Sequence, residues 1–146
     1  VRAIPLIAIA ALTASATTRA DEPLQALFGF TPPPGMSFTS DCPGGEVAMR
    51  ARFAGIQGIV CSDFPNEVAA GYAREALTGN ALSAGWTASE PLFGFNSPAL
   101  SRRHEKRGCT EHLFFDRGQR ENAGAGVTLN MMLVDDPACF ASGGAR

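Results

Sequence analysis

The chain holds two histidines, His104 and His112, and imidazole serves proteins both as a metal ligand and as a general base. Both lie in a segment that is predicted to form a β-hairpin turning at residues 106–108. In that hairpin His104 lies opposite Thr110, and His112 becomes its diagonal neighbour on the same face of the sheet. Glu111 then points to the opposite face. The two imidazoles are therefore expected within reach of each other.

A metal site built on these histidines lacks ligands. Zinc takes four protein ligands, or three and a water molecule. Asp116 has the parity to face the same side, but it lies several residues further along the strand. The sequence therefore predicts no metal ligands and no cofactor. A small hydrolase or metal-dependent enzyme that uses His104 and His112 is kept as the alternative function.

The same hairpin is rich in positive charge. Arginine suits planar, bidentate contacts with carboxylate or phosphate groups. Such a patch predicts binding of an acidic glycan, a phosphate or an acidic protein surface. The alternative is a solvated tip whose charges discourage edge-to-edge pairing. Replacing Arg102, Arg103 and Arg107 together with alanine is expected to leave the fold intact, because exposed charges contribute little stability. The candidate binding residues are Arg102, Arg103, His104, Lys106 and Arg107.

Motifs for nucleophilic, glycosidic or phosphate chemistry are weak or absent. The chain has no G-x-S-x-G elbow. Asp135 and Asp136 are adjacent carboxylates, and they are interpreted as part of a turn, because neighbouring strand residues point to opposite faces. Residues 124–126 contain only one G-x-G, without the third glycine of a dinucleotide-binding loop. No catalytic residue is predicted.

The N-terminal 20 residues have the order of an export signal. Arg2 precedes an apolar run over residues 3–12, and small residues follow, with cleavage expected after Ala16 or Ala20. The run is shorter than the ~20 residues that span a bilayer. The rest of the chain, without Arg2 and Arg19, has 10 basic and 14 acidic residues. That excess of acidic residues argues against nucleic-acid binding. The export signal and its short apolar run predict a periplasmic or secreted protein without a transmembrane span.

Four cysteines follow the signal, and an even number in an exported chain indicates disulfides. Their spacing matches neither CxxC nor a zinc finger. We expect each bond to join segments that are neighbours in the fold. The predicted pairs are Cys42–Cys61 and Cys109–Cys139, and loss of Cys109 should cost a few kcal/mol.

The elements that position these residues are predicted from hydrophobic periodicity. Residues 46–53 alternate as a strand, which pairs with a second strand at residues 59–61. Asp63 caps a helix that reaches Ala84 and ends at Gly85, with Val68 and Tyr72 on its buried face. Trp86 then opens a strand to Glu90 and belongs to the core.

The C-terminal half is predicted to be β-structure, with a hairpin of strands 99–105 and 109–116 and a last strand over residues 127–134. This order gives an α+β fold, an antiparallel sheet of about five to six strands with one main helix on one face and two disulfides. The other face is expected to be solvated or to bind a partner. The expected segments are a signal at 1–20, an extended segment at 21–45, the domain at 46–140 and a flexible tail at 141–146.

Together these features predict an exported, non-enzymatic binding or accessory module of the cell envelope. Layout alone does not assign a ligand.

Overall fold

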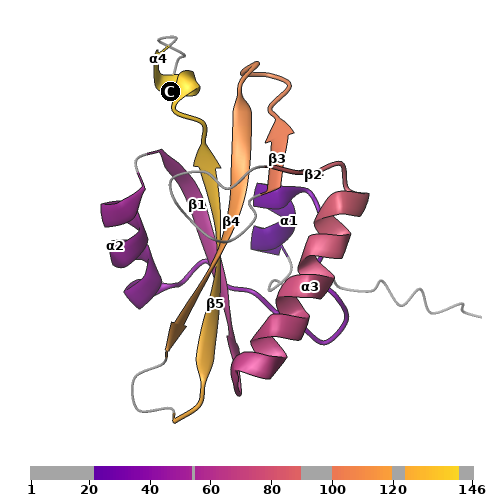
Figure 1. Ribbon diagram of the computed structural model, residues 1–146, viewed down its shortest axis with the longest axis vertical. Coiled ribbons are helices and arrows are strands. Elements are labelled where there is room, and N and C mark those ends of the chain that lie inside the picture. The colour runs from indigo at the N-terminus through magenta and orange to yellow at the C-terminus, as the bar shows by residue number, and fades with distance from the viewer. Residues whose placement is uncertain (1–21, 54, 90–99, 120–123, 142–146) are drawn as a thin grey trace, which may run out of the picture.

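The computed structural model describes residues 22–53, 55–89, 100–119 and 124–141 (Figure 1). The predicted signal, most of the predicted 141–146 tail and residue Glu90 lie outside these residues. The elements in chain order are α1 (Glu22–Phe28), α2 (Pro43–Arg52), β1 (Ile56–Phe64), α3 (Glu67–Ser83), β2 (Thr87–Ala88), β3 (Leu100–Arg103), β4 (Thr110–Gln119), β5 (Val127–Asp135) and α4 (Ala138–Ala141).

All five strands form one antiparallel sheet in the order β1-β5-β4-β3-β2. The predicted hairpin is confirmed as β3–β4, and the predicted last strand is confirmed as β5. The main helix α3 packs on the sheet. The α+β fold class predicted from the sequence is therefore confirmed.

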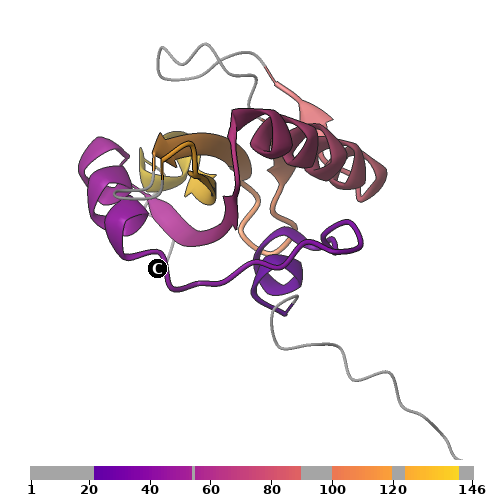
Figure 2. The ribbon, with the colours of Figure 1, turned by 90° about the horizontal axis from the view of Figure 1, so that it is seen from below.

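Helices α1 and α3 cover one face of the sheet, which we call the α3 face, and α2 covers the other, which we call the α2 face (Figures 1 and 2). The core of the α3 face contains Trp86, which is 2% exposed, as its large apolar surface predicted. The core of the α2 face is smaller and is built around Met49, Phe53, Phe114 and Met132. The expectation of a solvated second face is therefore wrong.

Helix α2 replaces a predicted strand. The alternation over residues 46–53 rested partly on alanine, which favours helices over strands. Pro43 lies in the first turn of α2, where the backbone N–H groups have no intrahelical acceptor, so the N–H that proline lacks costs no hydrogen bond. Met49 and Phe53 are four residues apart, and both are buried, whereas Val47 is 75% exposed. The spacing of four places the two large side chains on one helical face.

Helix α3 begins later than predicted and buries a different face. Its N-cap is Asn66, whose side chain accepts a hydrogen bond from the N–H of Ala69. Asp63, the predicted cap, lies in β1. Gly85 ends the helix with φ +99°, the left-handed conformation predicted for it. The buried residues are Ala70, Ala73, Leu77 and Ala81.

The segment before residue 46 belongs to the packed unit and is not a separate extended arm. Leu24 and Phe28 on α1 are fully buried, and Phe38 is 2% exposed. All three belong to the core of the α3 face. The close approach of α1 to β1 is visible at Gly58, where a Cβ atom would lie 2.7 Å from the Leu27 side chain.

Both predicted disulfides are confirmed. Cys42–Cys61 joins the start of α2 to β1, and Cys109–Cys139 joins the β3–β4 turn to α4. Two disulfides are compatible with a periplasmic or extracellular protein. None of the helices within the described ranges is long and apolar enough to cross a membrane.

Gly45 gives a test of the packing between α2 and the sheet. A Cβ atom at Gly45 would lie 2.7 Å from Oδ1 of Asn130, whose side chain is buried and has little room to move. We expect Gly45→Ala to lower the free energy of unfolding by about 1–3 kcal/mol, as overpacking does. Gly44→Ala is the control, because its Cβ meets nothing within 4 Å. Urea denaturation checks both, and equal stabilities would show that α2 does not pack on Asn130.

Candidate functional site

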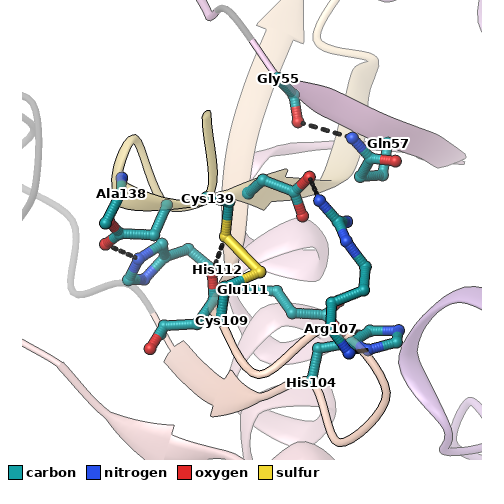
Figure 3. The surroundings of a disulfide bond; sticks show 12 residues. Gly55, Gln57, His104, Arg107, Cys109, Glu111, His112, Ala138 and Cys139 are labelled. Carbon is teal, nitrogen blue, oxygen red and sulfur yellow. Dashed lines mark hydrogen bonds and ion pairs between the residues drawn. A yellow bond between two sulfur atoms is a disulfide. The ribbon is translucent and has the colours of Figure 1, made fainter. Parts of the chain in front are cut away.

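The hairpin register differs from the prediction by one residue. The N–H of His104 donates to the carbonyl of Cys109, and Arg103 pairs with Thr110. A shift of one residue moves each side chain to the other face of a strand. His104 therefore lies beside Glu111, whereas His112 points to the α2 face (Figure 3). The predicted proximity of the two histidines is wrong.

Two carboxylates lie buried beneath this hairpin. Glu111 on β4 and Asp135 on β5 are directly opposite each other in the sheet, and they are 2% and 1% exposed. Like charges in directly opposed positions destabilise a sheet. Oε1 of Glu111 and Oδ1 of Asp135 accept no hydrogen bond from the described residues. The pair therefore needs compensating positive charge from nearby side chains.

The hairpin supplies that charge. Arg107 contacts Asp135 with Nη2 and Oδ2 2.7 Å apart (Figure 3). The close contact with the Asp135 carboxylate raises the pKa of Arg107. Arg102 approaches Glu111 to 3.6 Å, and His104 approaches it to 3.8 Å. Three of the five candidate binding residues are thus used inside the protein, which weakens the case for an anion site at the hairpin.

Arg102 also holds α1 against the sheet. Its guanidinium donates to the carbonyls of Leu27 and Phe28 at 3.0 and 2.8 Å. These carbonyls belong to the last turn of α1, where no intrahelical donor remains. The same guanidinium lies 4.3 Å from the centre of the Trp86 ring, and Trp86 Nε1 donates to the Phe28 carbonyl. Arg102 therefore ties the end of α1 to the sheet at the edge of the core, with its side chain 29% exposed.

Arg103 and Lys106 are the two candidate residues left on the surface. Both are exposed, and neither forms an ion pair with the residues that the structure describes. Arg103 is the neighbour of Arg102 in the chain and points to the other face of β3. Two separate cations make a weaker anion site than the predicted group of five.

His112 has the surroundings of a catalytic histidine only in part. Its Nε2 lies 3.0 Å from Oδ2 of Asp136, and Ser101 is its cross-strand neighbour. Serine, histidine and aspartate are the members of a hydrolytic triad. The remaining ring nitrogen, Nδ1, is buried and has no hydrogen-bond partner among the described residues. Because Ser101 is not bonded to the ring, the arrangement contains no activated nucleophile.

The His112–Asp136 contact predicts a pH effect on stability. The hydrogen bond from His112 lowers the pKa of Asp136 below its usual range, and the N–H of Ala138 adds to this effect. A lowered folded-state pKa means that the stabilisation is present above the ordinary aspartate pKa of about 3.9 and is lost as the pH falls through the folded-state value. We expect Asp136→Asn, which still caps α4, to flatten this acid limb in urea denaturation. A limb that stays equally steep would place its origin elsewhere.

The most exposed apolar surface was missed by the sequence interpretation. Val68, Tyr72 and Leu82 on α3 are 67%, 70% and 47% exposed. At 3.6 residues per turn they fall within about 80° of one another around the helix. They point away from the buried stripe of Ala70, Ala73, Leu77 and Ala81. The alanine-rich stripe was the sequence signal for the buried side of α3. Small alanine side chains let the helix pack closer to the sheet than valine and tyrosine do. We call Val68, Tyr72 and Leu82 the outer face of α3.

An open hollow of about 400 Å³ lies beside the C-terminal half of α3. Its lining carries no charged side chain. The hydrogen-bonding groups come from Gln25, Thr31, Asn80 and Ser83. Asn80 already donates to the Thr31 carbonyl at 3.0 Å, so part of this polar lining is used to join α3 to the chain after α1.

Within the described part of the chain, no group of three or more His, Cys, Asp or Glu side chains is arranged to hold a metal ion. A scan against protein-family models found no match, and comparisons with curated proteins and with solved structures found no significant similarity. The function is therefore argued from the geometry of this chain.

Proposed function

We propose that the chain is an exported binding or accessory module of the cell envelope, which docks a partner protein through the outer face of α3. The observation that carries the proposal is the exposure of Val68, Tyr72 and Leu82 on one side of a well-packed helix. Of the four large apolar side chains that are exposed in the described residues, three lie on this face. Exposed apolar side chains that gather on one side of a rigid helix favour an interaction site.

Contact with a partner is more favourable for these apolar side chains than exposure to solvent. A tyrosine and two aliphatic side chains on a rigid helix provide apolar area at a low cost in conformational entropy. Covering such side chains contributes about 25 cal/mol per Å² of apolar surface removed from water. Tyrosine is also enriched among the residues that dominate protein interfaces. The fold supports the surface from beneath, since Leu77 on the opposite side of α3 is fully buried.

Export is the second part of the proposal. The order of residues 1–20 is typical of a secretory signal, and disulfides persist in oxidising compartments. Production of the chain in an exporting bacterial host tests it by intact mass. The expected product lacks 16 or 20 N-terminal residues and gains four hydrogens on reduction of its two disulfides. An uncleaved product with free thiols would contradict export.

Docking is tested by site-specific photo-cross-linking in the cells that produce the protein. A photoreactive phenylalanine analogue replaces Tyr72 or Leu82, and the control replaces Lys106, an exposed residue of the hairpin turn. The expected result is the same adduct from both α3 positions and not from position 106. Cross-linking that is equal at all three positions, or absent at both α3 positions, would contradict docking on this face.

An enzyme that uses His104 and His112 is the weaker candidate. The two rings lie on opposite faces of the sheet, and each contacts a carboxylate of its own. Their separation leaves the alternative without the shared pocket that it requires.

A further inference from the structure

We infer that the occupant of the outer face of α3 is an apolar helical segment of a different protein, which carries a lysine or arginine opposite Glu75 and crosses α3 at Gly79. This inference rests on the proposed docking function and names the chemistry of the partner. Glu75 and Gly79 lie between Tyr72 and Leu82 along the helix, and both are exposed. By helical spacing they fall on the same outer face.

Packing within the described part of the chain does not require glycine at either of the two glycine positions of α3. Gly71 and Gly79 have no positive φ, and a Cβ atom at either position would meet nothing within 4 Å. A glycine in a helix interior costs about 1 kcal/mol relative to alanine. Because Gly79 has no side chain, the surface of α3 is recessed at this position between the apolar side chains. A recess of this kind lets the backbone of a second helix approach closely, as small residues do at helix crossings.

One negative charge without an ion pair to the described residues, Glu75, lies beside the outer face of α3. Glu67 and Glu75 are the charged residues of α3 that are classed as exposed, and both are acidic. Glu67 is bound to Arg117 at 2.8 Å, whereas Glu75 forms no ion pair with the described residues. Arg74 is directed toward the sheet, where its guanidinium lies over the Phe115 ring, 5.4 Å from its centre. A basic residue on the partner therefore gains a charge contact flanked by apolar contacts, which favours specificity.

The position of Glu75 argues against a second copy of the chain. Residue 75 is the middle of the 17-residue helix. A two-fold symmetric dimer of antiparallel α3 helices that covers the whole outer face, from Val68 to Leu82, is centred on residue 75 and places Glu75 against Glu75 of the partner subunit. Two like charges at the centre of an apolar interface would be unfavourable. The face therefore fits a heterologous partner whose charge is of the opposite sign.

The probe for this inference is a displayed library of helical peptides that is selected on the complete disulfide-bonded protein. The test variants are Glu75→Lys and Gly79→Leu, and Tyr72→Ser reports on the apolar face itself. The matched controls are Glu105→Lys, an exposed glutamate of the hairpin turn, and Gly44→Leu, where a Cβ also meets nothing within 4 Å. Circular dichroism and urea denaturation confirm that each variant folds, and leucine at position 79 should not weaken the helix.

The expected result is selection of amphipathic peptides that carry lysine or arginine among their apolar positions. Their affinity should fall about tenfold or more for Glu75→Lys and for Gly79→Leu, which corresponds to at least about 1.4 kcal/mol, and should not change for the two controls. Selection on the Glu75→Lys protein should instead enrich acidic peptides.

Two kinds of failure are distinguishable. Peptides that need Tyr72 but bind Glu75→Lys and Gly79→Leu as well as the unaltered protein would overturn the inferred partner chemistry and keep the docking face. Peptides that bind independently of Tyr72, or no selected binders at all, would also contradict docking on α3. Sedimentation equilibrium tests whether a second copy of the chain occupies this face. A dimer that dissociates on Tyr72→Ser would overturn the inference of a different protein as the partner.

Discussion

Replacing Arg102 with methionine is expected to lower the free energy of unfolding by about 3 kcal/mol, whereas the same change at Arg103 should alter it by less than about 0.5 kcal/mol. Arg102 donates two hydrogen bonds to carbonyls at the end of α1 and lies over the Trp86 ring. Its side chain is 29% exposed, so solvent screens only part of these interactions. Methionine retains much of the aliphatic stem and removes the charge.

The size of this effect follows from what the change leaves behind. The carbonyls of Leu27 and Phe28 lose charged donors, and hydrogen bonds that involve a charged group contribute about 1.5–3 kcal/mol each before losses elsewhere are counted. Glu111 remains buried with one cation fewer nearby. Removal of one partner from a buried charge pair is costly, because the other charge stays uncompensated.

Urea denaturation at pH 7 measures this difference, and near-ultraviolet circular dichroism reports on the surroundings of Trp86. Arg102→Lys is a further control, because lysine keeps the charge and cannot make the forked contact with two carbonyls. We expect it to recover only part of the stability. Equal stabilities for the Arg102 and Arg103 variants would show that the hairpin does not hold α1.

This prediction reverses an expectation from the sequence. The run at residues 102–107 is rich in positive charge, and exposed charges contribute little stability, so loss of three arginines was expected to leave the fold intact. Of the carboxylates that contact these cations, Glu111 lies in the same hairpin, whereas Asp135 lies on the next strand, β5. Asp135 follows an apolar strand and resembles the start of a turn, and only the β4–β5 pairing places it opposite Glu111.

Other features could be predicted because their signals are local. The β3–β4 hairpin, strand β5 and the stop at Gly85 follow from alternation, turn residues and the conformational freedom of glycine. The Cys109–Cys139 pair follows from the segments that it joins, whereas the Cys42–Cys61 pair is confirmed although the strand predicted at residues 46–53 is helix α2. The core position of Trp86 followed from its apolar area.

The features that were missed depend on choices that local patterns leave open. The pattern of residues 46–53 fits both a strand and a helix. The segment forms helix α2, whose start is bonded to β1 through Cys42–Cys61. Helix α3 has two candidate stripes, and the larger side chains of Val68 and Tyr72 made the wrong stripe the more apolar. The hairpin register shifted by one residue, and that shift alone separated His104 from His112.

Reduction of both disulfides is expected to unfold most of the protein at 37 °C. The bonds close loops with sequence separations of 19 and 30 residues. Loops of these lengths give about 3–4 kcal/mol each through the lower entropy of the unfolded chain. Their sum is about 7 kcal/mol, which is comparable with the whole stability of many domains of this size, about 5–15 kcal/mol.

Loss of each disulfide should unfold a different part of the protein first. Cys42–Cys61 ties α2 to the sheet, and the core beneath α2 is the smaller of the two. Its removal by paired Cys→Ser changes should release α2 before the sheet unfolds, with faster amide exchange in residues 43–52. Removal of Cys109–Cys139 frees α4 and the hairpin turn that carries Arg107, so it should weaken the Asp135 contact and lower the global unfolding free energy. Amide exchange with and without a reducing agent tests both, and protection of α2 that does not change when Cys42–Cys61 is lost would show that side-chain packing alone holds this helix.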